Sequence, residues 1–285
     1  MHTVREPAVS GVFYPSSKQL LTNDVKALLN EVTSKEAVSE AQAKVKEGPQ
    51  TYPKAIIVPH AGYIYSGKTA AKAYSQLASG RHTIKRVILL GPAHRMLVNG
   101  LALPDVDFFA TPLGRVALDQ DAMSLIAGLG QVDNNAAAHA LEHSLEVQLP
   151  FLQTVLDDFK LVPLLVGNAT PTEVAQVLDV LWGGAETLIV ISSDLSHYLP
   201  YGLAQDLDKE TVQNILNLDG VLTHKQACGG TPVNGFVLAA MRHQLKPELL
   251  DLCNSGDTAG DKRHVVGYAS IAFRPSTSTS AASHA

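Results

Sequence analysis

The chain has 285 residues, of which 46% are hydrophobic and 17% charged, and its formal net charge is −5. This composition is typical of a folded globular protein, and the length is sufficient for one large α/β domain. The acidic balance provides no basic surface for nucleic acid or an anionic membrane, and no apolar stretch approaches the roughly 20 residues that a membrane helix needs.

The cysteines and the N-terminal residues indicate a reducing compartment. Cys228 and Cys253 are too few for a disulfide framework, although a single bridge between them stays open. Residues 1–7 have no apolar region of the kind that a secretory signal needs. We therefore expect a cytoplasmic protein with neither nucleic acid nor membrane as a partner.

Hydrophobic periodicity predicts strands and helices that alternate along the chain. In chain order, the expected elements are a helix at 19–32, a polar helix extension or linker at 34–51, a strand at 54–59, a helix at 67–78, strands at 86–90 and around 98–109, helices at 119–129 and 142–156, a strand at 159–166, a helix at 171–182, a strand at 187–192, helices at 201–217, 219–227 and 232–245, and strands at 248–254 and 265–273. This order predicts an α/β fold, a single domain whose central, mostly parallel or mixed sheet is flanked by helices. The domain is expected to span 1–274, and the low-complexity tail at 275–285 is expected to be disordered.

Three apolar runs are each followed within a few residues by a histidine, namely His60, His94 and His197. Such runs suit strands buried on both faces of a parallel sheet, and ligands of open α/β sheets bind outside the carboxyl ends of the strands. Three imidazoles at that edge could form a metal site or an acid–base site. Asp194 could fix the tautomer of His197 and raise its basicity, or it could simply cap the following helix.

Two further segments carry reactive side chains. Cys228 lies in a glycine-rich stretch between two expected helices, where it could be a metal ligand, a nucleophile or a small buried hydrophobe. His143 and Glu146 are three residues apart on the helix expected from Glu142, so they should share one face. Because a di-iron bundle needs two Glu-x-x-His copies, we expect a salt bridge or a pocket wall instead, with Tyr63 also at the pocket wall.

The remaining histidines and the absence of common motifs limit the candidate site residues and functions. Five histidines without a comparable setting are expected to be surface or structural residues: His82, His139, His224, His243 and His264. The chain contains no Gly-x-Gly-x-x-Gly, P-loop, Gly-x-Ser-x-Gly or Cys-x-x-Cys motif, so nucleotide-binding and serine-hydrolase functions lose most of their support.

Taken together, six segments resemble the Memo-like family, whose bacterial and archaeal members are often called AmmeMemoRadiSam system protein B. The resemblance spans about residues 5–273 and rests on these stretches in order: 11–15, 59–63, 91–94, 142–150, 192–198 and 228–232. The family is similar in fold to the LigB-like class III extradiol dioxygenases, which are non-haem iron enzymes. A LigB-dioxygenase-like architecture is therefore expected.

The resemblance implies that His60, His94 and Cys228 are metal-binding positions and that His197, with Asp194 beside it, is the acid–base residue. Cys228 stands where the dioxygenases have a carboxylate. A thiolate softens the site toward Cu(I) or zinc, while iron remains a candidate. The chain also has Gly230-Thr231 where the family usually has Arg-His, so a substrate or anion contact made by that pair cannot be carried over.

These observations lead to one main hypothesis and two alternatives. The main hypothesis is a Memo-like metal-binding protein with a dioxygenase-like pocket, one iron or copper ion (zinc as the alternative) and, if it is an enzyme, redox or oxygenase-type chemistry. The alternatives are a metal-free cysteine hydrolase that uses Cys228, His197 and Asp194, and a peptide-binding scaffold on a vestigial site. The expected partners are a small molecule or a peptide, together with the radical-SAM and AMMECR-like proteins that the resemblance implies.

Overall fold

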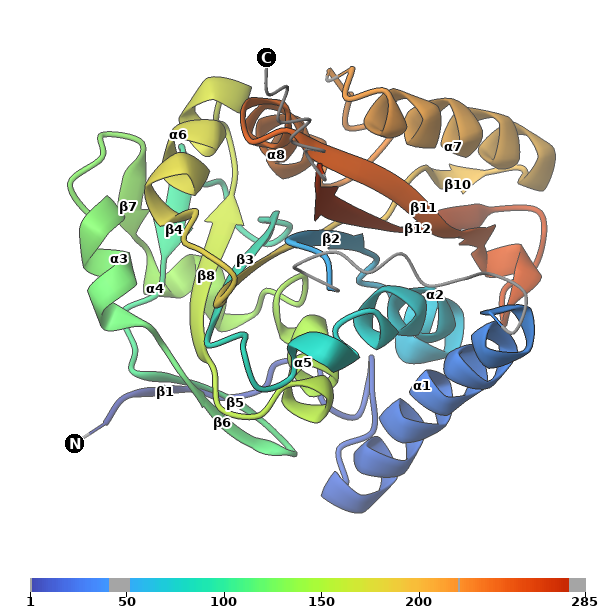
Figure 1. The fold of residues 1–285 in the computed structure, drawn as a ribbon, viewed down its shortest axis with the longest axis horizontal. Coiled ribbons are helices and arrows are strands. Elements are labelled where there is room, and N and C mark those ends of the chain that lie inside the picture. Colours follow the sequence, from blue (N-terminus) through green and yellow to red (C-terminus); the bar gives the residue numbers. More distant parts are fainter. Residues whose placement is uncertain (1, 41–51, 220, 277–285) are drawn as a thin grey trace, which may run out of the picture.

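The computed structural model describes residues 2–40, 52–219 and 221–276, in which strands and helices alternate (Figure 1). The strands are β1 (Val4–Arg5), β2 (Ala55–Val58), β3 (Arg86–Pro92), β4 (Leu101–Leu103), β5 (Phe108–Thr111), β6 (Gly114–Ala117), β7 (Val132–Asn134), β8 (Lys160–Val166), β9 (Thr187–Ser192), β10 (His197–Leu199), β11 (Leu245–Asn254) and β12 (Val265–Pro275). The helices are α1 (Lys18–Glu40), α2 (Tyr63–Ser75), α3 (Gln120–Ile126), α4 (Ala136–Ala140), α5 (Leu149–Val155), α6 (Pro171–Leu181), α7 (Tyr201–Leu216) and α8 (Gly230–Arg242).

The described residues form a nine-stranded sheet in the order β10-β12-β2-β9-β3-β8-β4-β7, with β11 paired to β12, and a small sheet in the order β1-β5-β6. The centre of the large sheet is parallel, because β2, β9, β3 and β8 run the same way. Strands β10, β11 and β12 extend it with antiparallel pairing on one side. The predicted α/β fold with a central mixed sheet flanked by helices is confirmed.

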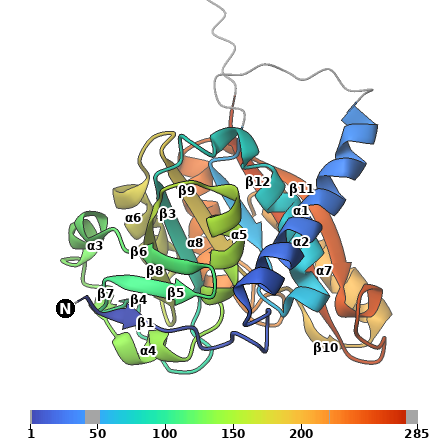
Figure 2. The same cartoon turned by 90° about the horizontal axis from the view of Figure 1, so that it is seen from below.

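Helices cover both faces of the central strands, which explains why those strands are apolar along their whole length. Every residue of β2 and β9 is buried, as a sheet covered on both faces requires. Figure 1 shows α6 and α8 on one side of the sheet and α1, α2 and α5 on the other. Figure 2 shows the small sheet near β4 and β7, at the end of the molecule away from β11 and β12.

The parallel strands end level with one another, which brings their following loops to one edge. Val58 at the end of β2 faces Ser192 at the end of β9, and Leu90 of β3 faces Ile191. His60 follows β2 by two residues and His94 follows β3 by two residues. The sheet therefore delivers these loops to the edge at which open α/β sheets bind ligands.

One predicted helix is absent from the described residues, and another begins later than expected. Residues 221–227 form turns, because the side chain of Asn234 bonds both the N–H and the carbonyl of Leu222, and Gln226 Oε1 accepts from the N–H of Thr223. Such side-chain bonds compete with helical pairing. The helix expected at 142–156 begins only at Leu149, after a 3₁₀ turn at Glu146–Gln148.

Several smaller expectations can also be placed. α1 runs on to Glu40 into the polar segment predicted at 34–51, whereas 41–51 fall outside the described residues, as do 277–285 of the predicted tail. Cys228 and Cys253 are both free thiols, so the bridge that the sequence left open is not formed. Within the described ranges, every helix is too short or too polar to cross a membrane.

Candidate metal centre

Three histidines come together at the carboxyl edge of the sheet. His60, His94 and His143 each offer one ring nitrogen, and these nitrogens lie within 4.8 Å of one another. The ring centroids of His60 and His94 are 5.2 Å apart, and those of His94 and His143 are 4.7 Å apart. The sequence placed His143 at the pocket wall, whereas the structure adds it to the group that could hold a metal ion.

Cys228 lies beside this cluster, in the turn that precedes α8. Its Sγ is 3.2 Å from Nε2 of His60, and its backbone N–H donates to the carbonyl of Asp194. Burial, reinforced by the charge of Asp194, raises the pKa of the Cys228 thiol well above its usual range. Without a cation, the sulfur therefore stays protonated, whereas a bound metal ion would reverse this preference by stabilising the thiolate.

The hydrogen bonds around Ser192 assign the tautomer of His60. Ser192 donates its one hydroxyl proton to the carbonyl of Ser144 at 2.6 Å and accepts from the amide of Gln148 at 2.9 Å. Nδ1 of His60 lies 2.9 Å from the same hydroxyl oxygen, so Nδ1 must carry the proton that this oxygen accepts. The lone pair of His60 is thereby left on Nε2, the atom that faces Cys228.

His60 is also held in the neutral form that binds metals. It is 2% exposed, and burial, followed by the nearby His94 and His143, lowers its pKa well below the usual value. A neutral imidazole whose Nδ1–H is engaged and whose Nε2 carries the lone pair matches the ligand form of histidine at metal sites.

Glu142 orients His94 through a buried carboxylate. Oε2 accepts from the backbone N–H of His94 at 2.6 Å, and Oε1 lies 2.9 Å from Nδ1 of the same residue. Oε1 also accepts from the N–H groups of His143 and Ser144, both at 2.9 Å. Burial alone would raise the pKa of Glu142, but the nearby imidazoles of His143 and His94 outweigh it and hold that pKa well below its usual range. The ionised carboxylate thus accepts a hydrogen bond from Nδ1–H of His94 and leaves the lone pair of this ring on Nε2.

The ring of His143 still has an unsatisfied atom. Its Nδ1 lies 3.1 Å from Glu142 Oε1 but makes no well-aligned hydrogen bond, although it is buried. This orphaned nitrogen, the two oriented imidazoles and the thiol together form a donor set that suits a transition-metal ion. The residues present therefore fit such an ion.

The sequence predicted that Asp194 and His197 pair with each other, but in the structure each of them bonds another group. Asp194 Oδ1 accepts from the backbone N–H of His60 at 2.7 Å, and burial raises the pKa of this carboxyl against that hydrogen bond. His197 lies 2.8 Å, through Nδ1, from the carbonyl of Leu195. Asp194 thus fixes the His60 loop with its carboxyl and the Cys228 loop with its carbonyl, while a backbone carbonyl orients His197.

Tyr63 and Glu146, predicted at the pocket wall, lie behind the site. The hydroxyl of Tyr63 donates to the carbonyl of Val147 at 2.7 Å. Glu146 is fully buried, pairs with Arg5 and accepts from the N–H of Ala8 at 2.7 Å. Because the chain turns at 142–145 instead of forming a helix, His143 faces the cluster and Glu146 faces the N-terminal segment. The shared helix face predicted for these two residues is therefore wrong.

Two pockets open beside the cluster. A pocket of about 350 Å³ is lined by thirteen residues: Phe13, Ala61, Gly62, Tyr65, His143, Asp194, His197, Tyr198, Ser255, Gly260, His264, Val266 and Tyr268. A larger one of about 680 Å³ is lined by residues that include His94, Cys228, His224, Met96 and Leu97. His224 and His264, expected to be surface or structural residues, thus line pockets, and the centre can be approached from two sides.

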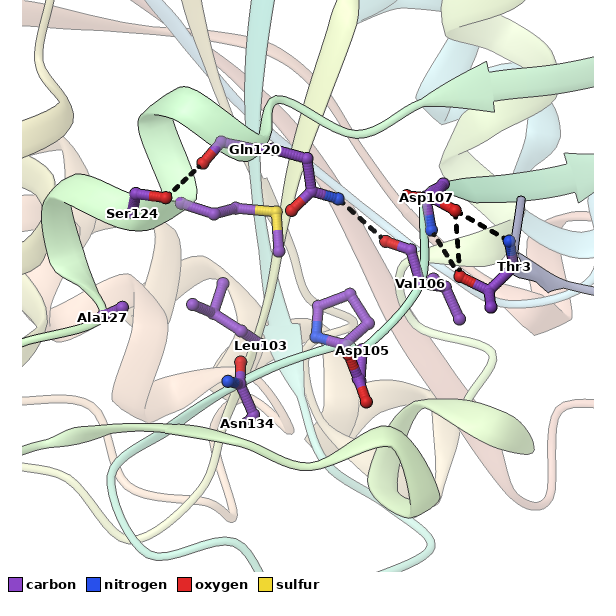
Figure 3. A pocket seen from close by; sticks show the side chains of 11 residues that line it. Thr3, Leu103, Asp105, Val106, Asp107, Gln120, Ser124, Ala127 and Asn134 are labelled. Carbon is purple, nitrogen blue, oxygen red and sulfur yellow. Dashed lines mark hydrogen bonds between the residues drawn. The ribbon is translucent and has the colours of Figure 1, made fainter. Parts of the chain in front are cut away.

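A third pocket, of about 220 Å³, lies between the 103–107 segment and α3 and contains none of the predicted site residues among those described (Figure 3). Much of its polar lining is already paired, because Asp107 accepts from the N–H of Thr3 at 2.7 Å and Gln120 donates to the carbonyl of Val106 at 3.0 Å. The chemistry-bearing side chains are therefore gathered at the histidine cluster.

The signal that could have identified His143 is its position next to Glu142. Metal-bound histidines usually hydrogen-bond a carboxylate or carbonyl through the ring nitrogen that does not bind the metal, and a buried neighbouring carboxylate can serve as this partner. Periodicity instead assigned both residues to a helix. Phe13 and Tyr198 belong to the segments 11–15 and 192–198 that carry the family resemblance. Their place at the pocket depends on contacts between distant parts of the chain, which the sequence does not reveal.

Sequence comparison matches this protein to known proteins over nearly the whole chain. The family model described as Memo-like protein matches residues 5–272. A MEMO1 family protein of Aquifex aeolicus is 38% identical, covering 95% of this chain and 99% of the relative, and one of Caldivirga maquilingensis is 35% identical, covering 94% and 98%. An uncharacterised Escherichia coli K12 protein of known structure aligns with a TM-score of 0.49 and 14% identity, over 75% of this chain and 98% of that one. With a family match and relatives of this similarity spanning almost every residue, the protein belongs to the Memo-like family.

Proposed function

We propose that this protein binds one transition-metal ion through His60, His94, His143 and Cys228 and uses it for redox or oxygenase-type chemistry in the adjoining pocket. The observation that carries the proposal is the hydrogen-bond network, which commits Nδ1–H of His60 to Ser192 and Nδ1–H of His94 to Glu142. Both imidazoles are thereby oriented to donate to a metal through Nε2 before any ion arrives.

The ligand types limit which metal ions the site would favour. Imidazoles accept iron, copper and zinc, and a thiolate shifts preference toward the softer ions Cu(I) and Zn(II). A redox-active ion, when bound, would supply one-electron chemistry and Lewis acidity that no side chain of the pocket can supply. Iron or copper is therefore the proposed cofactor, with zinc as the alternative.

In this proposal, protein side chains would transfer protons and position the metal-binding loops. Nδ1–H of His197 donates to the carbonyl of Leu195, which leaves Nε2 to take or give a proton at the pocket. Asp194 would keep the loops of His60 and Cys228 in register, and Glu142 would hold His94. These roles, the partners expected from the sequence and a cytoplasmic location remain predictions.

The metal-free cysteine hydrolase is less well supported. A nucleophilic Cys228 needs an activating base and a lowered thiol pKa. The imidazole next to its sulfur is His60 and not His197, and burial raises the thiol pKa. Stoichiometric labelling of Cys228 by an acyl-type electrophile, unaffected by a chelator, would favour the hydrolase over the metal protein.

The decisive experiment is elemental analysis of protein purified anaerobically without a histidine tag. We expect about one iron or copper per chain in the wild type and loss of most of it in His60→Ala and Cys228→Ala. His82→Ala is the matched control, because the His82 side chain is 84% exposed and lies outside the cluster. Unchanged metal content in both site variants, with melting temperatures close to that of the wild type, would refute the proposal.

A further inference from the structure

Tyr198 has a backbone conformation that its side chain disfavours and that no helix end explains. Its φ is +59°, in the left-handed region that residues with a Cβ rarely occupy. Among the described residues, the other non-glycine residues with positive φ are Leu218 and Gln244. Each of these lies two residues beyond the end of a helix, α7 or α8, where a left-handed residue commonly terminates the helix.

The conformation of Tyr198 belongs to a β-bulge in β10. His197 pairs with Val266 and Leu199 pairs with Val265, so two steps along β10 match one step along β12 and Tyr198 is the extra residue. In a regular strand, successive side chains point to opposite faces. Here His197 and Tyr198 line the same pocket, because bulges redirect side chains in this way.

The surrounding hydrogen bonds hold the bulge in place. Gly267 accepts from the N–H of Leu195 at 2.8 Å and donates its own N–H to Ser196 at 2.9 Å. Asp208 Oδ1 accepts from the N–H of Ser196 at 3.0 Å, and a Cβ on Gly267 would lie 2.0 Å from the other oxygen of Asp208. A strained residue persists where its neighbours fix it in this way, and such residues gather at binding sites.

The ring of Tyr198 gains little from packing in the free protein. Tyr198 is 72% exposed, and its ring contacts that of His197, at 5.8 Å between centroids. The energetic cost of the left-handed backbone conformation is therefore offset neither by burial of the ring nor by termination of a helix. The pocket that the ring borders also contains Phe13, Tyr65 and Tyr268, so a ligand with a flat apolar face would find aromatic surfaces on several sides.

We propose that Tyr198 is a ligand-contacting residue, and that the bulge holds its ring as the outer wall of the pocket, over a ligand that reaches the metal centre. This inference rests on the proposed metal-dependent function. It predicts that removing the ring weakens binding of a ligand that extends from the metal into the pocket, while a ligand confined to the metal is unaffected.

The test uses Co(II)-loaded protein, whose visible spectrum reports ligand binding, with imidazole and 4-phenylimidazole as probes. In Tyr198→Gly, we expect the affinity for 4-phenylimidazole to fall about three- to tenfold, as the loss of one aromatic contact predicts, while imidazole affinity is unchanged. Tyr198→Phe should keep both affinities. The control is Gln244→Gly, which relieves the same backbone conformation beyond α8 and should alter neither affinity.

Glycine adopts positive φ freely, so metal-free Tyr198→Gly should melt no lower than the wild type. A clear loss of melting temperature would overturn the view that the conformation is strained. Equal 4-phenylimidazole affinity in wild type and Tyr198→Gly would overturn the ligand contact alone. If the wild type bound no Co(II), the proposed metal-dependent function would fail and this inference with it.

Discussion

Buried His139 should make the protein lose stability as the pH falls from about 6.5 toward 4. The residue lies in α4 and is 2% exposed, and its Nε2 is 2.9 Å from the carbonyl of Ala102. Burial lowers the pKa of His139 to about 4, against a smaller opposing effect of that hydrogen bond. The charged groups that act on it are Arg5, which lowers the pKa further, and Glu142, which raises it.

The direction of the effect follows from proton linkage. Between the folded pKa of about 4 and the ordinary histidine pKa of 6.5, the unfolded chain binds more protons at this site than the folded chain does. The free energy of unfolding therefore rises with pH across this window and is lost as the pH falls through it. At 1.36 kcal/mol per pKa unit, His139 should account for about 2 kcal/mol of loss by pH 5 and about 3 kcal/mol by pH 4.

The assay is urea unfolding of the chelator-treated protein at pH 7, 6 and 5, for the wild type and His139→Gln. Chelation matters because metal binding releases protons of its own. Glutamine keeps an N–H for the carbonyl of Ala102 but does not titrate, so between pH 7 and pH 5 the variant should lose about 2 kcal/mol less than the wild type. His82→Gln, at an exposed histidine, should follow the wild type. If the free energy of unfolding changed with pH equally in the wild type and His139→Gln, the reasoning would be refuted, because the buried imidazole would then not be the group that titrates.

Three further predictions concern the site and the packing of the helices. Glu142→Gln should weaken metal binding about ten- to a hundredfold in a chelator competition, since outer partners of metal-bound histidines typically have effects of that size; an affinity within twofold of the wild type would contradict the role given to this carboxylate. Co(II)-loaded protein should show sulfur-to-metal charge-transfer absorption that disappears in Cys228→Ser, and its persistence would exclude the thiolate as a ligand. Gly235→Ala should lower the free energy of unfolding by about 1–3 kcal/mol, because the new Cβ would lie 2.3 Å from Cβ of Val174, whereas Gly202→Ala meets nothing within 4 Å and should be neutral or stabilising.

The sequence was sufficient to predict the parts of the fold that depend on burial along a single element. The runs that became β2, β3 and β9 are apolar because helices cover them on both faces, so their composition identifies them as parallel strands. Once they are parallel, the residues that follow them must meet at one edge. The closeness of His60 and His94 could therefore be predicted without any knowledge of loop structure.

The loops could not be predicted in the same way, because long-range side-chain bonds decide their conformation. Residues 142–148 have apolar spacing that suits a helix, yet Glu142 bonds the N–H groups of His94, His143 and Ser144 and prevents a helix from starting there. Periodicity contains no information about a partner 48 residues away. For the same reason, the sequence assigned Asp194 to His197, whereas the fold brings Asp194 to the backbone of His60.

The three residues that end β9 and begin its loop act together on the site. The Ser192 hydroxyl sets the tautomer of His60, the Ser193 hydroxyl accepts from the N–H of Gly229 at 3.0 Å, and Asp194 binds the backbone of both His60 and Cys228. A Cβ on Gly229 would lie 2.6 Å from Cβ of Ser193, so this approach requires glycine. Because the end of a buried strand is among the most rigid parts of a sheet protein, the distance between the imidazole and the thiol is fixed by the core and not by mobile loops. A centre organised in this way should keep its donor geometry when the metal is absent, which is the preorganisation that a metal site needs.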